Sequence, residues 1–202
     1  SSFENNKSLS IIELNEGLIT LSKRSFANCR SLKKLHIPSS LVDLNESSFS
    51  DCVELGFLDF SSKCILTNIG DYAFKNTGLE KVEFPPSVKT TGMFCFQYCS
   101  KLTSVLFKKI EIIGKGTFHS CDGLCTVGIE ENTLKTIGDG AFYSCVKLEE
   151  FCFPSDSILK SIGNGAFQNC ISLKNMKLER VEYIGELAFY SCSSFTEINI
   201  PG

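Results

Sequence analysis

One phenylalanine recurs along the whole chain at a nearly constant interval, and this repeat limits the fold more than any other feature. The intervals between successive members are 23, 23, 25, 22, 22, 24, 25 and 22 residues. The series is Phe3, Phe26, Phe49, Phe74, Phe96, Phe118, Phe142, Phe167 and Phe189. A pattern that repeats from end to end is typical of a solenoid, in which each unit packs only against its neighbours.

Each unit also contains three apolar residues with the spacing L-x-x-L-x-L, and the last two alternate with outward positions. The triplets are Leu9/Ile12/Leu14, Leu32/Leu35/Ile37, Leu55/Leu58/Phe60, Leu79/Val82/Phe84, Leu102/Val105/Phe107, Leu124/Val127/Ile129, Leu148/Phe151/Phe153, Leu173/Met176/Leu178 and Phe195/Ile198/Ile200. Alternation with a period of two is typical of a short strand that buries one face. The rest of each unit is too short for a long helix, so we expect a single helical or 3₁₀ turn there.

The repeat therefore predicts an α/β solenoid, with a parallel β-sheet on one wall and short helical or 3₁₀ turns on the other. It covers residues 1–202 as a single domain of about nine units of 22–25 residues. Terminal repeats normally carry polar caps, and neither end of this sequence shows one. We therefore expect the chain to be a fragment of a longer protein.

The segment from Leu148 to Cys170 shows the unit almost completely, as L-x-x-L-x-L-P-x-x-L-x-x-I-G-x-x-A-F-x-x-C. This unit resembles the BspA-like, or Treponema pallidum-type, class of leucine-rich repeats, and the resemblance extends over all nine units. The Asn ladder of the common leucine-rich repeat is absent. The resemblance implies an adhesin-like surface or secreted protein of oral bacteria or mucosal protozoan parasites, which binds host cells, host matrix or other microbes.

We interpret the recurring Phe, together with the Cys that follows it three residues later in seven units, as a buried structural ladder. Such a Cys lies one turn further along on the same side as the Phe and packs as a small hydrophobe. We expect these thiols to be reduced. The ladder consists of Phe26, Phe49, Phe74, Phe96, Phe118, Phe142, Phe167 and Phe189, with Cys29, Cys52, Cys99, Cys121, Cys145, Cys170 and Cys192.

Four cysteines lie outside this ladder, namely Cys64, Cys95, Cys125 and Cys152. Cys95 and Cys99, with Cys121 and Cys125, have a C-x₃-C spacing that would suit zinc. We favour a structural interpretation, because two of these residues belong to the ladder and Cys95 takes the place of a core alanine. We therefore expect no metal and no cofactor. Cys152 is expected to point outward from its strand.

No group of residues in the sequence indicates catalysis. We place His36 on the outward face of a strand and His119 on a turn near Cys121, whose burial argues against a Cys–His nucleophile pair. The glycine-rich segment 137–140 lacks the G-K-[ST] of a phosphate-binding loop, and we interpret its glycines as turn residues with positive φ. We therefore expect a protein that is not an enzyme.

Composition argues against two kinds of partner. The 20 basic and 23 acidic residues give a net charge of −3, which does not favour nucleic acid. No run of 18 apolar residues exists, so this segment should not insert into a membrane.

The 11 cysteines fit a reducing compartment at least as well as an oxidising one. An intracellular, cytoplasmic scaffold or sensor for protein–protein interaction is therefore the alternative to a surface or secreted protein. Asn6 and Asn45 lie in N-glycosylation motifs, which matter only after export from a eukaryotic cell.

The outward strand residues form the candidate binding surface, with Phe57, Asp59, Lys81, Glu83 and Leu106 at its centre. Phe57 and Leu106 are apolar where solvent is expected, and charged neighbours surround them, as in an interface core with a polar rim. The expected partner is a protein, such as a host matrix or cell-surface protein. Nine strands about 4.8 Å apart give a strip of roughly 400–500 Å². A standard interface needs about 800 Å² from each partner, so flanking loops or further repeats would have to contribute.

Overall fold

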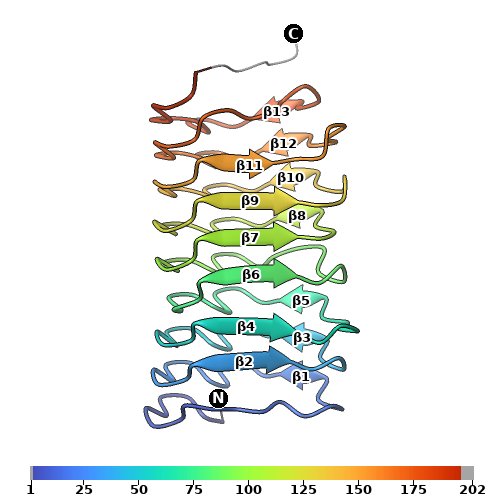
Figure 1. Cartoon of the computed structure of the whole chain (residues 1–202), viewed down its shortest axis with the longest axis vertical. Helices are drawn as coiled ribbons and strands as arrows, with labels where there is room; N and C mark the ends of the chain where they lie inside the picture. The colour runs from blue at the N-terminus through green and yellow to red at the C-terminus, as the bar shows by residue number, and fades with distance from the viewer. Residues whose placement is uncertain (1, 197–202) are drawn as a thin grey trace.

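The protein is a stack of similar coils, and most coils contribute one longer strand and one shorter strand (Figure 1). The coordinates are a computed structural model, and the structure describes residues 2–196. β1 and β13 lie toward opposite ends of the stack. Ile198 and Ile200 of the last expected triplet lie outside the described residues.

The longer strands form a parallel wall and alternate between buried and outward residues. They are β2 (Lys34–Ile37), β4 (Phe57–Phe60), β6 (Lys81–Phe84), β7 (Ser104–Phe107), β9 (Thr126–Ile129) and β11 (Glu150–Cys152). β2 pairs with β4, and β6, β7, β9 and β11 pair in sequence, with equivalent residues of successive coils opposite each other. The predicted parallel sheet is confirmed.

The second wall consists of two-residue parallel strands. They are β1 (Thr20–Leu21), β3 (Asp43–Leu44), β5 (Asn68–Ile69), β8 (Ile112–Ile113), β10 (Thr136–Ile137), β12 (Ser161–Ile162) and β13 (Tyr183–Ile184). Residues 2–196 contain no α- or 3₁₀-helix, so the predicted helical or 3₁₀ wall is wrong. Each short strand leads into a run of turns that contains the core Phe.

Hydrogen bonds between coils explain why these turn runs are not helical. Around Phe49, the residues two positions before and after, Ser47 and Asp51, have φ of 55° and 60°. The N–H groups of Ser47, Phe49 and Asp51 each donate to a carbonyl of the next coil at 2.8 Å, whereas Ser50 donates to its own coil, to the Ser47 carbonyl at 3.2 Å. A 3₁₀-helix would keep all these bonds within the coil. Bonding to the neighbouring coil therefore sets the conformation.

The recurring Phe rings form a continuous stack through the centre of the solenoid. Successive ring centroids lie 5.1–5.6 Å apart, within the range of favourable aromatic pairs. The members from Phe49 to Phe167 are fully buried, Phe26 is nearly so, and Phe189 is partly buried. Phe3 is 49% exposed.

The ladder cysteines are buried from Cys29 to Cys170 and partly buried at Cys192, and all eleven cysteines are free thiols in the structure. Each ladder thiol donates to the carbonyl oxygen of the core Phe in the preceding coil, at S···O distances of 3.0–3.2 Å. The Phe142 oxygen, for example, accepts the Cys145 N–H and the Cys170 thiol, both at 3.1 Å. The thiol is therefore a hydrogen-bond donor between coils as well as a small hydrophobe.

The glycines of the Gly-x-Gly segments have two different roles, which corrects the single role that we expected from the sequence. Gly140 and Gly165 have positive φ, but Gly138 and Gly163 do not. A Cβ atom on Gly163 would lie 2.5 Å from the backbone nitrogen of Asp139 in the preceding coil. Gly163 is therefore needed because the coils approach closely, and the left-handed conformation belongs to the second glycine.

We predict that Phe142→Ala lowers the free energy of unfolding by about 3–5 kcal/mol, because it opens a cavity in the closed ring stack. Phe142 is fully buried between Phe118 and Phe167, at centroid distances of 5.3 and 5.1 Å. Phe3→Ala should cost much less, because its ring is already half-exposed. Urea unfolding of the two variants checks this, and equal losses would contradict the stacked core.

We also predict that the protein loses stability at alkaline pH through its buried thiols. Burial raises the pKa of Cys52 from 9.0 to about 12 and also raises that of Cys145. A raised thiol pKa favours the protonated folded state, so this stabilisation is complete below about pH 9 and is lost as pH rises toward the folded pKa. For a thiol whose pKa is raised to about 12, as for Cys52, the loss at pH 10 is roughly 1.4 kcal/mol. Urea unfolding at pH 7.5 and pH 10 should therefore show a smaller loss for Cys145→Ala than for wild type. Equal losses would show that this thiol contributes nothing.

Candidate binding surface

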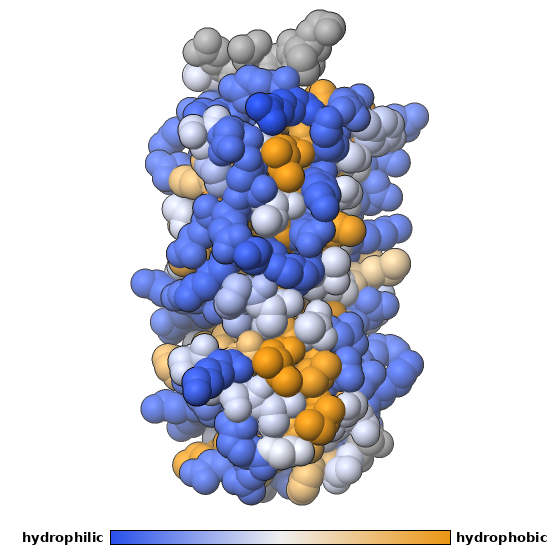
Figure 2. All heavy atoms as spheres, turned by 90° about the vertical axis from the view of Figure 1, so that its right-hand side faces the viewer, coloured by the Kyte–Doolittle hydropathy of each residue, from blue (hydrophilic) through white to orange (hydrophobic). Residues whose placement is uncertain are grey.

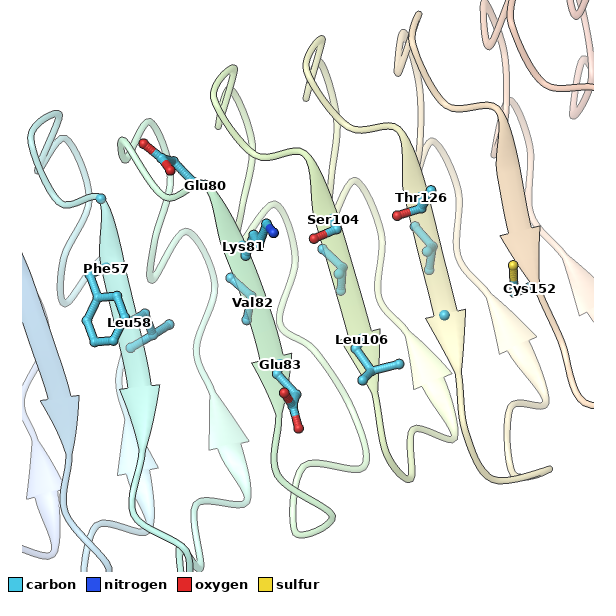
Figure 3. A pocket seen from close by; sticks show the side chains of 14 residues that line it. Phe57, Leu58, Glu80, Lys81, Val82, Glu83, Ser104, Leu106, Thr126 and Cys152 are labelled. Carbon is cyan, nitrogen blue, oxygen red and sulfur yellow. The ribbon is translucent and has the colours of Figure 1, made fainter.

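The five predicted surface residues lie on three successive longer strands, as Figure 3 shows for four of them. Phe57 is 54% exposed, and Lys81 and Glu83 are also exposed. Asp59 and Leu106 are half-buried. We expected Leu106 to face solvent, but its side chain leans over the neighbouring coil, where a Cβ atom on Gly128 would lie 2.8 Å from Leu106 Cδ1. The missing side chain of Gly128 gives Leu106 a place to pack.

Phe57 lies where three shallow grooves of the strand face meet. The first groove crosses from β4 toward β11 past Leu106 and Cys152, with a volume of about 560 Å³. The second, of about 490 Å³, runs past Ile11 and His36. The third, of about 300 Å³, passes Phe60. Because Phe57 lines all three, its ring is accessible from several sides. Ile11, which is 74% exposed, extends this apolar area beyond the residues that we predicted.

Polar contacts between neighbouring coils surround this aromatic residue. His36 Nδ1 lies 2.9 Å from Asp59 Oδ2, and Lys108 Nζ lies 2.8 Å from Glu83 Oε1. All four side chains are at least 39% exposed, so each pair adds little to stability. The pairs instead place charges of both signs around Phe57.

The hydrogen-bonded ladder of longer strands is interrupted between β4 and β6, and we call this interruption the β4–β6 seam. The two strands belong to different sheets, and Figure 1 shows a wider spacing between them than between their neighbours. In the adjacent coils Gly56 donates to the Lys33 carbonyl at 3.1 Å and Thr103 donates to the Glu80 carbonyl at 2.8 Å. Among the described residues, no equivalent bond joins Glu80 to Gly56.

Two sequence features occur together at the seam. The connection from Thr77 to Leu79 is one residue shorter than the connection from Cys52 to Leu55. Pro85 follows β6 and has no N–H, although the residue that follows β4, Ser61, donates to the preceding coil at 2.9 Å. At the seam, Phe60 is only half-buried although it occupies a core position. Both signals are visible in the sequence, but their joint effect on one strand pair was missed.

The other sequence candidates do not converge on a site. Residues 2–196 contain no group of three or more His, Cys, Asp or Glu that could hold a metal ion. Cys95 is fully buried, and Cys125 is half-buried with its thiol donating to the Gly123 carbonyl at 3.3 Å. Cys64 is buried, whereas Cys152 is exposed beside the first groove.

Three further polar residues have local structural roles. His119 stacks on Tyr143 with ring centroids 4.6 Å apart, and partial burial lowers the pKa of its imidazole. The Asn45 amide donates to the Leu21 carbonyl at 2.8 Å, so this glycosylation motif is engaged in coil stacking. The Asn6 side chain is exposed and accepts the N–H groups of Ser8 and Leu9, both at 3.1 Å.

The sequence matches the family described as BspA type leucine rich repeat region (6 copies), over residues 1–103 and again over residues 89–202. The chain belongs to this family. BspA-type repeats are typically non-enzymatic binding scaffolds, and the match indicates no catalytic family. Within residues 2–196, no helix has the length and apolar character that crossing a membrane requires.

Solved structures of bacterial proteins share this BspA-type fold. A leucine-rich repeat protein from Bacteroides ovatus is 26% identical, with a TM-score of 0.73, over 98% of this chain and 56% of that one. The leucine-rich repeat protein of T. pallidum is also 26% identical, with a TM-score of 0.69, over 82% and 77%. The pneumococcal vaccine antigen PcpA is 24% identical, with a TM-score of 0.55, over 93% and 56%. This chain thus spans just over half the length of the first and third proteins. No curated protein matches the chain.

We predict that some backbone amides of β6 exchange with solvent much faster than those of β7. β7 is hydrogen-bonded on both sides, to β6 and β9, whereas β6 lacks a hydrogen-bonded neighbour at the seam. Exchange is fast where amides are unpaired and close to solvent. Residue-resolved hydrogen exchange by NMR checks this, and uniformly slow exchange along β6 would show that the seam closes in solution.

Proposed function

We propose that this BspA-type chain is a non-enzymatic, protein-binding module of an adhesin-like surface or secreted protein. Stacked repeats expose an extended wall to which each coil adds a few variable side chains. The proposed site is the strand face around Phe57, with Asp59, Lys81, Glu83 and Leu106 as its other members. The partner that we propose is a host matrix or cell-surface protein.

The position of Phe57 is the observation that carries the proposal. A half-exposed aromatic ring where three grooves meet can be contacted by a partner from several sides. Aromatic anchors at the centre of a patch, surrounded by polar groups, are the residues that dominate the binding energy of protein interfaces. The polar contact of Asp59 with His36 and the ion pair of Glu83 with Lys108 supply such a rim.

The size of the face supports weak binding by a single copy. Its outward strip, at roughly 400–500 Å², is smaller than the area of about 800 Å² that each partner gives to a standard interface. We propose that several modules act together, because linked weak sites gain affinity through effective concentration. The greater length of two of the related structures leaves room for such repetition.

The alternative is an intracellular scaffold or sensor that uses the same face. The 11 cysteines fit the reducing interior of a cell at least as well as an oxidising compartment. An antibody against this chain separates the two proposals. Staining of intact, non-permeabilised cells supports the surface module, and staining only after permeabilisation supports the scaffold.

We predict that Phe57→Ser weakens binding to immobilised host matrix proteins or host cells at least tenfold, as expected for a central aromatic anchor. The matched control is Tyr183→Ser, because Tyr183 is also 54% exposed but lies on a short strand of the other wall. Surface plasmon resonance and circular dichroism measure binding and folding. Unchanged binding by a folded Phe57→Ser, Leu106→Ser double variant would exclude this face as the site.

A further inference from the structure

A further groove lies over the turn runs and shares no residue with the strand-face grooves. Its volume is about 380 Å³, and we call it the turn-face trough. Gly140 and Gly165 form its floor at the position two residues before the core Phe, with φ of 56° and 57°. Gly116 has the same position in the preceding coil, with φ of 58°, but the Phe94 ring covers it, since a Cβ atom there would lie 2.2 Å from Phe94 Cε1. Other coils carry side chains at this position with similar φ, such as Arg24 at 55° and Tyr72 at 56°. The trough exists because two successive coils, those of Gly140 and Gly165, have no side chain there.

Side chains of neighbouring coils surround the floor. Phe94 and Leu187 occupy the same position in the coils on either side and close the two ends. The Phe94 ring leans over the coil of Gly116, so the open floor runs from that coil to the coil of Leu187, three coil spacings or about 15 Å. One side carries Lys115, Asp139, Asn164 and Glu186, and the other carries His119, Tyr143 and Gln168.

Contacts between coils hold both sides of the trough in place. The His119 and Tyr143 rings stack with centroids 4.6 Å apart and an interplanar angle of 18°. Asp139 Oδ1 accepts the Asn164 N–H at 2.8 Å, and Asn164 Oδ1 accepts the Glu186 N–H at 2.8 Å. Side chains that are already fixed lose little conformational entropy when a ligand binds.

The trough nevertheless contains polar groups without partners. In an earlier coil pair, the residues equivalent to Lys115 and Asp139 form an ion pair, Lys23 with Glu46 at 2.8 Å. Within residues 2–196, Lys115, Asp139 and Glu186 have no ion-pair partner. The second carboxylate oxygen of Asp139 likewise accepts no hydrogen bond there. These groups are therefore free to bind a ligand.

We propose that the turn-face trough binds a short neutral oligosaccharide. Carboxylate and amide side chains, such as those of Asp139, Asn164 and Gln168, can each bond to neighbouring hydroxyl groups of a sugar. His119 and Tyr143 offer apolar ring surface to its C–H groups and polar atoms to its hydroxyls. Because the trough has two acidic residues, Asp139 and Glu186, and only one lysine, Lys115, its net negative charge disfavours anionic ligands such as phosphate, sulfate or sialic acid. The volume lies within the range of small-molecule sites.

NMR titration of the ¹⁵N-labelled chain tests the ligand class. The neutral probes are maltotriose, cellotriose, chitotriose and N-acetyllactosamine. The charged probes are 3′-sialyllactose, a heparin tetrasaccharide and tetralysine, which represents a basic peptide. We expect at least one neutral probe to shift the amide resonances of residues 116–119, 139–143 and 164–168 in a saturable way. The proposal is overturned if no neutral probe does so, or if a charged probe binds there more tightly.

A variant that fills the trough tests the location of the site. A Cβ atom on Gly140 would meet only Tyr143 Cβ, at 3.8 Å, and Leu187 shows that leucine accepts this position with φ of 55°. Gly140→Leu should raise the Kd for the bound oligosaccharide at least tenfold. Arg24→Leu, at the same position of a coil outside the trough, should change this Kd by less than twofold relative to wild type. A folded Gly140→Leu with wild-type affinity would overturn the proposal. If Gly140→Leu does not fold, the Gln168→Ala variant tests the location instead. An unchanged Kd for the oligosaccharide in that variant would also overturn the proposal.

Discussion

The structure depends on the contact between each core Phe and the next coil. Its ring stacks on the next Phe ring, and its carbonyl accepts an N–H from its own coil and, except at Phe49, where the next coil has Thr77 in place of the ladder Cys, a thiol from the next coil. Its own N–H also donates to the next coil, as Phe142 does to the Ala166 carbonyl at 2.7 Å. These three contacts fix the coil spacing and its register together. A coil cannot slip by one residue without losing all three.

This constraint separates the positions that must repeat from those that can vary. Buried thiols and rings recur because each satisfies two coils at once, whereas outward strand and turn residues touch only their neighbours along the surface. The surface features therefore arise at departures from the repeat. A shortened connection and Pro85 occur at the β4–β6 seam, Gly128 gives Leu106 a place to pack, and successive glycines leave the turn-face trough. The proposed sites lie at these departures.

Features that follow from a local pattern within one unit were predictable from the sequence, and features that arise between coils were not. The parallel strands were predictable, because their apolar alternation is a local pattern that only one buried face explains. The turn runs were not, because their length suits a 3₁₀ turn equally well. Hydrogen bonds from Ser47, Phe49 and Asp51 to the next coil decide against it. The thiol as a donor was missed for a similar reason, because its acceptor lies more than 20 residues away in the chain.

The sequence by itself determined the family, the parallel wall and the ladder of Phe and Cys, because each follows from the spacing within one unit. Of the proposed strand-face site, it placed Phe57, Lys81 and Glu83 on the outward face. Only the tertiary structure decided that Phe57 lies where three grooves meet, that Leu106 turns toward Gly128, and that the turn-face trough exists. Stacking brings residues that are 22–25 positions apart to within about 5 Å of each other. Which of those residues are large, small or charged then determines the surface, and no single unit contains that information.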